Sequence, residues 1–129
     1  MSVELNHTII WCSDKERSAA FLTQILGRPA ARPFYHFLVV DLDNHVSIDF
    51  FEKEGSVSRQ HYAFLLSDAE FDSAFARIEE RALAYWADPA RTKPGEINRH
   101  DGGRGVYFED PDGHLLELIT RPYGSGTGS

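Results

Sequence analysis

Two segments of the chain share one order of hydrophobic and polar positions. Residues 7–16 read HTIIWCSDKE and residues 61–70 read HYAFLLSDAE, so each begins with a histidine and ends with Ser-Asp-x-Glu. The apolar part of each segment is short and rich in β-branched or aromatic residues, which predicts a strand. The Ser-x-x-Glu that follows is a capping box, in which both side chains bond the first backbone N–H groups of a helix. The pattern predicts helices that begin at Ser13 and at Ser67.

The repetition continues through the two expected helices. A shift that aligns His7 with His61 also aligns Phe21 with Phe75. Apolar residues follow at helical spacing in both segments, and Gly27 ends the first helix. Two copies are too few for a solenoid. The sequence therefore predicts two similar modules related by pseudo-symmetry.

Each expected helix is followed by a pair of strands joined by a turn. In the first half, residues 35–42 and 45–52 flank an Asp-Asn turn, so they are expected to form a hairpin. In the second half, residues 104–110 and 114–120 flank Pro-Asp-Gly in the same way. The order strand, helix, strands occurs twice, which predicts the α+β fold class.

Shorter signals complete this organisation. A short strand near Tyr85 precedes the second hairpin, and Pro33 keeps its first-half counterpart short or at a sheet edge. The loop 88–103 lacks apolar periodicity and is long enough to be a lid or a disordered segment. One domain is expected over residues 1–122, with modules of about 4–54 and 58–121, followed by a flexible tail over residues 123–129.

Composition and charge narrow the choice of partners. The 129 residues are 42% hydrophobic and 26% charged, which is typical of one globular domain. A formal net charge of −7 without runs of Lys or Arg argues against nucleic acid and anionic membranes as partners. The chain has no apolar run of membrane-spanning length and no signal-peptide pattern, so a cytoplasmic location is expected. Cys12 is the only cysteine, which excludes an internal disulfide.

Three polar residues interrupt strand faces that are otherwise apolar, because strand side chains alternate between faces. They are His7 beside Ile9 and Trp11, His61 beside Ala63 and Leu65, and Glu117 beside Leu115 and Ile119. A polar group on such a face is costly unless it is paired or binds a metal. Two imidazoles and one carboxylate form the triad that suits Fe(II), and Mn, Zn or Ni also bind it. From the residues alone, hydrogen-bonded structural histidines and a glutamate paired with an arginine remain an equal explanation.

Taken as a set, these motifs resemble those of the vicinal oxygen chelate superfamily. This superfamily includes glyoxalase I, fosfomycin-resistance thiol transferases, extradiol ring-cleavage dioxygenases and bleomycin-resistance proteins. The resemblance extends from about Glu4 to Arg121 and rests on NHTII, QHYAF and EDPDGHLLELIT. It implies two βαβββ modules whose mixed sheets form a cup around a divalent metal, with His7, His61 and Glu117 as the metal ligands.

The chain is most similar to the extradiol dioxygenases around its glutamate. Their signature is a histidine, five to seven residues, an aliphatic-Tyr pair, x-x-D-P-x-G and the glutamate, and it falls here on His100, Tyr107 and Glu117. The resemblance implies a metal-dependent dioxygenase, with Fe(II) or Mn favoured over Zn or Ni, and a small aromatic or vicinal-oxygen substrate. The candidate catalytic residues are His100, Tyr107 and His45, and the candidate substrate-binding residues are Ile9, Trp11, Ala63, Leu65 and Arg104.

Rival functions and a fourth ligand stay open. Glyoxalase I has a glutamate ligand on its fourth strand, where this chain has Asp49. Counted from the preceding histidine, Asp49 is one residue out of step with Glu117, so we expect it to support the site rather than bind the metal. The rivals are a glyoxalase-like lyase or fosfomycin-type thiol transferase, and a non-catalytic antibiotic-binding resistance protein. The resemblance also implies a homodimer.

Overall fold

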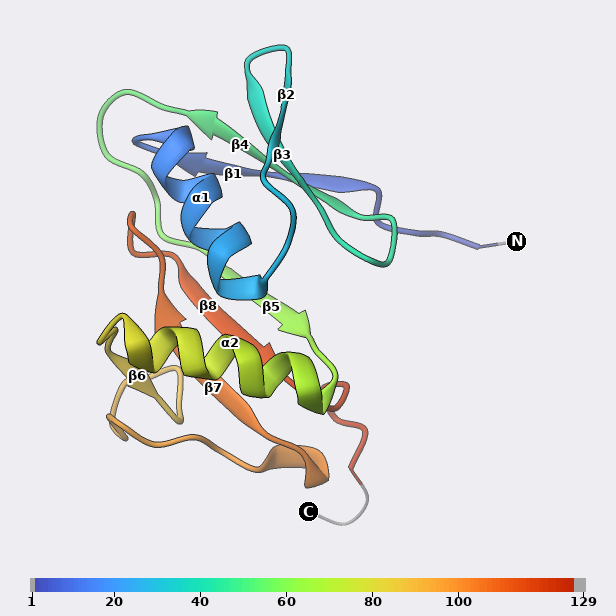
Figure 1. Cartoon of the computed structure of the whole chain (residues 1–129), viewed down its shortest axis with the longest axis vertical. Coiled ribbons are helices and arrows are strands. Elements are labelled where there is room, and N and C mark those ends of the chain that lie inside the picture. The colour runs from blue at the N-terminus through green and yellow to red at the C-terminus, as the bar shows by residue number, and fades with distance from the viewer. Residues whose placement is uncertain (1, 127–129) are drawn as a thin grey trace. The chain divides into compact units, whose positions relative to one another are not determined.

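The first half of the chain forms one compact unit. The computed structural model describes residues 2–126 and divides the chain into Met1–Ser58 and Arg59–Ser129. The elements of the first unit are β1 (His7–Cys12), α1 (Lys15–Leu26), β2 (Arg32–Phe34), β3 (Phe37–Asp41) and β4 (Ser47–Glu52). Its strands lie in the order β1-β4-β3-β2, with β1 parallel to β4 and the other pairs antiparallel (Figure 1).

The second unit repeats this architecture. Its elements are β5 (His61–Leu65), α2 (Asp68–Glu80), β6 (Tyr85–Trp86), the 3-10 turn η1 (His100–Gly102), β7 (Gly105–Glu109) and β8 (Leu115–Ile119). The sheet order is β5-β8-β7-β6, and again only the outer pair, β5 with β8, is parallel. The expected α+β class and the two βαβββ modules are confirmed. None of the helices in the described part of the chain is long and apolar enough to cross a membrane.

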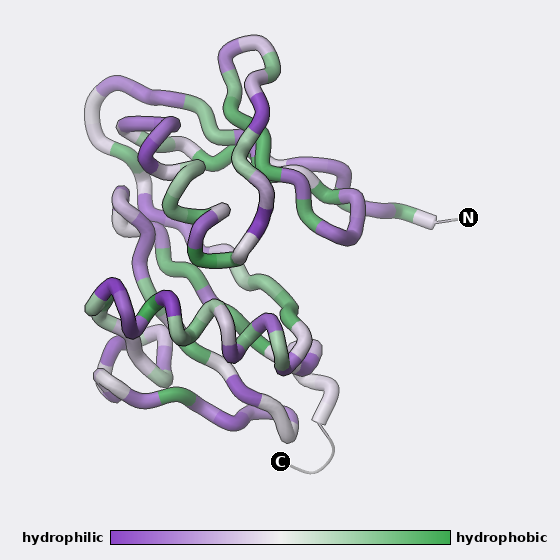
Figure 2. Tube along the Cα trace, viewed as in Figure 1, coloured by the Kyte–Doolittle hydropathy of each residue, from purple (hydrophilic) through white to green (hydrophobic). Residues whose placement is uncertain are grey.

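Each sheet buries one face beneath its own helix and leaves the other face more exposed within its unit. In β1, Ile10 and Cys12 are buried, whereas Trp11 is 44% exposed. In β5, Phe64 is buried and Leu65 is 60% exposed. Figure 2 shows that β5 is hydrophobic along most of its length. The expected alternation is therefore present, and the open faces carry the candidate ligands.

The helix ends follow local chemistry with one difference from the expected pattern. The side chain of Ser67 accepts a hydrogen bond from the backbone N–H of Glu70, so α2 is capped as expected. The N-cap of α1 is Asp14, whose carboxylate accepts from the backbone N–H of Arg17. The first helix therefore begins one residue later than predicted, because an Asp can cap a helix as well as a Ser.

The two hairpin turns are built alike. In the first, the backbone N–H of Leu42 donates to the carbonyl of Val46, and in the second Asp110 donates to His114 in the same way. The Asp110 carboxylate also accepts from the N–H of His114 at 2.9 Å. Burial raises the pKa of Asp110. The imidazole of His114 is fully buried, and its Nδ1 accepts from the N–H of Gln60 at 2.9 Å. His114 is thus a structural residue of the turn.

The loop 88–103 holds its shape through two polar side chains. The Asp88 carboxylate accepts from the backbone N–H groups of Thr92 and Lys93 at 2.9 and 3.0 Å. The Asn98 side chain donates to the carbonyl of Ala87 at 2.8 Å, and its backbone pairs with Gly105. These bonds lead the chain into η1 and then into β7. Of the expected tail, residues 127–129 lie outside the described residues.

Candidate metal and substrate site

The second unit brings His61 and Glu117 together. In the parallel ladder of β5 and β8, His61 lies opposite Leu115 and Ala63 lies opposite Glu117. The His61 Nε2 atom is 3.1 Å from the Glu117 Oε1 atom, and the Glu117 side chain is buried. The Nδ1 atom of His61 is 3.0 Å from the backbone carbonyl of Leu115. Register therefore places an imidazole and a carboxylate on the same open face.

The contact between His61 Nδ1 and the Leu115 carbonyl determines which ring nitrogen carries the proton when the imidazole is neutral. A carbonyl oxygen only accepts, so the Nδ1 of His61 must donate its proton to Leu115. In the neutral ring the Nε2 atom then carries a lone pair, which faces another acceptor, the Glu117 carboxylate. Two acceptors at this distance attract a cation between or beside them, either a proton or a metal ion that displaces it. A ring N–H held by a backbone carbonyl is also the usual support of a metal-binding histidine.

Tyr107 completes this side of the site. It lies opposite Glu117 in the antiparallel ladder of β7 and β8, and its ring stacks near that of His61 with centroids 6.0 Å apart. Burial, followed by its hydrogen bond and charge interaction with Glu117, raises the pKa of Tyr107 far above the usual range. The phenol therefore stays protonated and is a hydrogen-bond donor at neutral pH.

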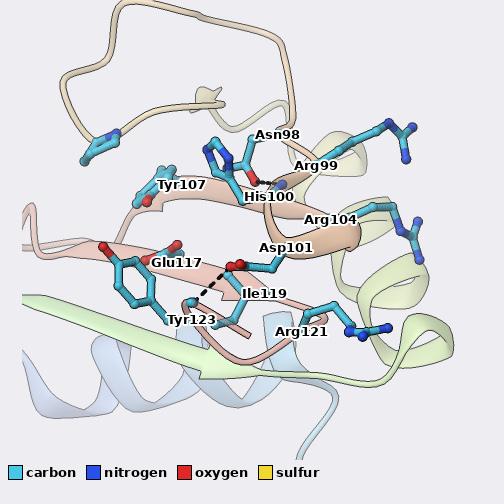
Figure 3. Close-up of a pocket in the computed structure, with 12 residues that line it drawn as sticks. Asn98, Arg99, His100, Asp101, Arg104, Tyr107, Glu117, Ile119, Arg121 and Tyr123 are labelled. Carbon is cyan, nitrogen blue, oxygen red and sulfur yellow. Dashed lines mark hydrogen bonds between the residues drawn. The ribbon is translucent and has the colours of Figure 1, made fainter. Parts of the chain in front are cut away.

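A cavity of about 560 Å³ opens beside Glu117 within the second unit. It is lined by Pro89, Asn98, Arg99, His100, Asp101, Arg104, Tyr107, Glu117, Ile119, Arg121, Tyr123 and Gly124. Figure 3 shows His100, Tyr107 and Tyr123 gathered around Glu117, while the guanidinium groups of the three arginines point away from it. The cavity thus joins the expected residues His100 and Tyr107 to the Glu117 side of the site.

Arg104 lines this cavity, but its charge is engaged elsewhere. Its guanidinium donates to Asp72 at 2.6 Å and to Asp68 at 3.2 Å, and it lies 4.6 Å from the ring centre of Phe71. The hydrogen bond to Asp72, more than any other interaction, raises the pKa of Arg104. The side chain therefore fastens β7 to α2, whereas its expected contact with substrate stays a prediction.

The first unit holds an equivalent pair of residues. The Nδ1 atom of His7 is 2.7 Å from the side-chain oxygen of Asn6, which leaves Nε2 as the lone-pair atom in the neutral ring. His7 lies opposite Ser47 in the ladder, and Ile9 lies opposite Asp49. The buried Asp49 carboxylate accepts from the Ser47 hydroxyl at 2.9 Å.

The register corrects one expectation about Asp49. Ile9 faces Asp49 as Ala63 faces Glu117, so Asp49 and Glu117 hold the same position in their modules. The expected offset of one residue is wrong, because it was counted from His45. The matching turn bonds show that Val46, and not His45, stands where the second turn has His114. The supporting role expected for Asp49 stays a prediction, but Asp49 lies on the same face as the candidate ligands, so strand alternation does not exclude it as a metal ligand.

The remaining candidates lie on open faces or in turns. Ile9 and Trp11 lie on the open face of β1, and the Trp11 ring packs edge-on against Phe51 with centroids 5.2 Å apart. Ala63 and Leu65 are exposed on the open face of β5. His45 is an exposed residue of the turn before β4, with a backbone φ of 65°. Their roles toward a substrate stay predictions.

The structure assembles two of the three expected ligands. Among residues 2–126, no group of three His, Cys, Asp or Glu side chains lies close enough together to hold a metal. His61 and Glu117 are a pair within one unit, and His7 belongs to the other unit. The donor set still fits a divalent ion, because the Nδ1 atom of each histidine has a hydrogen-bond partner and the Nε2 atom of His61 faces the Glu117 carboxylate, another ligand that such an ion prefers.

Asp101 and Tyr123 are among the cavity residues that the sequence did not indicate. Tyr123 belongs to a segment whose Gly and Ser content is typical of a flexible tail. The one signal that could have singled out Tyr123 is its bulk, since a large aromatic residue is unusual in a flexible polar segment.

Comparison with known proteins places this chain in a family. The sequence model of the Glyoxalase/Bleomycin resistance protein/Dioxygenase superfamily matches residues 4–118. The chain belongs to this superfamily. The superfamily contains metal-dependent enzymes that act on small molecules, so its membership supports a divalent metal and a small substrate here.

Individual relatives within the superfamily carry different activities in their names. The solved structure of oxidase ChaP-H1 is 59% identical, with a TM-score of 0.93 over 95% of this chain and 99% of that chain. Oxidase ChaP-H2 is 54% identical, with a TM-score of 0.95 over 98% of this chain and 99% of that chain. Metallothiol transferase FosB of Shouchella clausii (strain KSM-K16) is 36% identical over 123 residues, covering 90% of this chain and 79% of the relative.

Proposed function

We propose that this protein is a divalent-metal-dependent oxidoreductase acting on a small aromatic molecule with neighbouring oxygen atoms, in the manner of an extradiol dioxygenase. The observation that carries the metal site is the 3.1 Å distance between His61 Nε2 and the Glu117 carboxylate, with the Nδ1 of the same ring held by the Leu115 carbonyl. Support for an oxidative reaction comes from a relative, named an oxidase, that is 59% identical over 95% of this chain.

The proposed metal ligands are His61, Glu117 and, from the first module, His7. Asp49 is retained as a fourth ligand or a supporting carboxylate, since it holds the register position of Glu117. A divalent ion held by this set supplies a Lewis acid for two neighbouring substrate oxygens and, as Fe(II), an electron donor for reaction with O2.

The residues around Glu117 would manage protons and solvent. Tyr107 stays protonated because its pKa is raised. Its single hydroxyl proton is shared with Glu117 here, and it would turn to an anionic substrate oxygen once Glu117 binds the metal. His100 lies at the exposed side of the same cavity and would move a proton between a substrate hydroxyl and solvent. Open-face residues such as Trp11 and Leu65 would exclude water from the aromatic ring.

Metal content and oxygen consumption test this function. The protein is purified without added metal and analysed for metals, then loaded with Fe(II) under argon and mixed with a series of substituted catechols and O2. Ring cleavage predicts consumption of one O2 per catechol and a product heavier than the substrate by both oxygen atoms. His61→Ala is expected to lose bound metal and O2 consumption, whereas the matched control His36→Ala, an exposed turn residue, keeps both. Absence of O2 consumption by the Fe(II) protein with every catechol would contradict the oxidative proposal.

A thiol transferase is the second candidate, favoured by the 36% identity to metallothiol transferase FosB. Arg99 and Arg121 line the cavity, and their guanidinium groups would have to turn toward Glu117 to meet an anionic substrate there. Arg104 is held by two aspartates and contributes less. The Mn(II)-loaded protein is incubated with fosfomycin and glutathione or cysteine, and mass spectrometry detects the adduct. An adduct, without O2 consumption on catechols, would replace the first proposal by this one.

We also propose that the protein forms a homodimer, as small members of the superfamily do. Light scattering of the purified protein measures this directly. A mass of one chain at micromolar concentration would contradict the dimer without affecting the proposed ligands.

A further inference from the structure

The segment after β8 turns back and is fastened to the loop that lines the cavity. One carboxylate oxygen of Asp101 accepts from the backbone N–H of Gly124 at 3.0 Å, and the other accepts from that of Gly126 at 2.8 Å. A backbone bond from the N–H of Ser125 to the carbonyl of Pro122 at 3.0 Å closes the turn between them. We call residues 122–126 the C-terminal strap. Both carboxylate oxygens of Asp101 thus accept hydrogen bonds from the strap.

The backbone on both sides of this contact is shaped for it. Asp101 has a φ of 58°, a left-handed conformation that Asp adopts more readily than most residues. A Cβ atom on Gly126 would lie 2.5 Å from the Cα atom of Asp101, so only glycine allows this approach. A close approach of two backbones with two hydrogen bonds gives the strap a defined place at the cavity.

The strap carries one large side chain, Tyr123, to the cavity. Tyr123 lines the cavity together with Glu117 and Tyr107. Figure 3 shows its ring beside the Glu117 carboxylate. Tyr123 is nevertheless 91% exposed, and within residues 2–126 its side chain makes no ring contact or hydrogen bond. Packing within the described chain therefore does not account for an aromatic ring at this place.

We infer that Tyr123 is a substrate-contacting residue, and that Asp101 is a positioning residue that holds it over the cavity. This inference rests on the proposed function, since the ligand it implies is a small molecule whose planar ring carries two neighbouring oxygens. The planar ring of the ligand lies against the aromatic face of Tyr123, and the two oxygens of the ligand point toward Glu117. Ring stacking needs the aromatic face of Tyr123 and not its hydroxyl, which separates Tyr123→Phe from Tyr123→Ala.

Binding of 4-nitrocatechol to the Zn(II)-loaded protein tests the inference without turnover. The dissociation constant, measured by absorbance titration, is expected to rise about two- to tenfold in Tyr123→Ala and to change less than about twofold in Tyr123→Phe. Asp101→Ala is expected to weaken binding to a similar degree because the strap is released. Tyr35→Ala and Asp43→Ala, which replace exposed residues of the first unit, are the matched controls and should bind like wild type.

Two further measurements distinguish loss of a substrate contact from loss of the folded site. Bound zinc per chain should be the same in all variants, since neither Asp101 nor Tyr123 is a proposed ligand. Amide exchange at Gly124 and Gly126 should become faster in Asp101→Ala and stay unchanged in Tyr123→Ala. Equal or tighter binding of 4-nitrocatechol by Tyr123→Ala and Asp101→Ala would overturn this inference alone. Absence of binding by the wild-type protein with a full complement of zinc would overturn the proposed function as well.

Discussion

At the scale of single residues, the site depends on where each imidazole places its proton. His7 and His61 each donate from Nδ1, one to a side-chain amide and the other to a backbone carbonyl. Because this leaves both Nε2 atoms as acceptors, the two modules present the same chemistry to a cation. That His7 and His61 hold equivalent positions could be predicted from the sequence repeat. Their hydrogen-bond partners could not, because the Leu115 carbonyl reaches His61 only through the parallel register of two distant strands.

Replacement of Tyr107 by Phe should change how stability depends on pH at the alkaline end. The folded-state pKa of this tyrosine is raised, so the unfolded chain releases the proton first, above about pH 10. Its stabilising contribution is complete below that pH and declines as pH rises toward the folded-state pKa. The free energy of unfolding, measured with urea at several pH values, should therefore fall less steeply above pH 10 in Tyr107→Phe.

The same titration on Tyr35→Phe is the control, since Tyr35 is exposed in the first unit. Equal alkaline slopes for Tyr107→Phe and the wild type would show that the phenol ionises as an ordinary tyrosine.

At the scale of elements, local signals fixed most helices and strands. The cap at Ser67, the left-handed Gly27 after α1 and the turn before β8 depend on residues close in sequence, so pattern alone located them. Two features needed the structure. The first is the N-cap of α1, because the neighbouring residues Ser13 and Asp14 can both cap a helix. The second is the strand face on which Asp49 lies, because the two hairpin turns differ in sequence. Strand pairing determined that face, since register is set between segments that lie far apart.

Removal of the α1 cap should have a moderate effect on stability. Asp14→Ala is expected to lower the free energy of unfolding by about 1 kcal/mol, because the backbone N–H of Arg17 loses its acceptor. Asp14→Asn keeps an acceptor oxygen and should lose only a small part of this. Urea denaturation of the three proteins gives the comparison. Equal loss in both variants would indicate that charge at the helix start matters more than the cap.

Arg104 is expected to act on the fold first and on ligands second. Its guanidinium joins the start of β7 to α2 through Asp72, Asp68 and the ring of Phe71. Arg104→Ala should lower the free energy of unfolding by about 1 kcal/mol, and Arg104→Lys should recover little because the planar fork is lost.

The comparison with ligand binding decides its role. In the folded Arg104→Lys protein, the dissociation constant of 4-nitrocatechol is expected to change less than about threefold, since the arginine contacts two aspartates. A larger loss of binding with unchanged stability would restore the original expectation that Arg104 contacts the substrate.

At the scale of the whole molecule, each of two compact units carries a histidine and a carboxylate at matching ladder positions. They are His7 and Asp49 in the first unit, and His61 and Glu117, which are in contact, in the second. The duplication could be predicted from the sequence because both copies keep the same capping and strand patterns. Whether one metal ion takes ligands from both modules depends on how the modules pair, which no local sequence pattern encodes.

Metal affinity tests the combination. If one ion takes ligands from both modules, His7→Ala and His61→Ala should each weaken zinc binding by at least about tenfold, because each removes one of three ligands. His36→Ala is the control for loss of an exposed histidine. Affinities are measured by competition with a chromogenic chelator. Wild-type affinity in His7→Ala would show that His7 is not a ligand.

The attachment of Gly124 and Gly126 to Asp101 also bears on how the protein is handled. An affinity tag fused after Ser129 begins four residues after Gly126 in the sequence, and Gly126 is the last residue of the strap. A tag of that kind, above all one rich in histidines, would compete for metal close to the cavity. A tag without metal-binding side chains avoids that competition. Preparations that differ only in whether the tag is rich in histidines should therefore differ in apparent metal content.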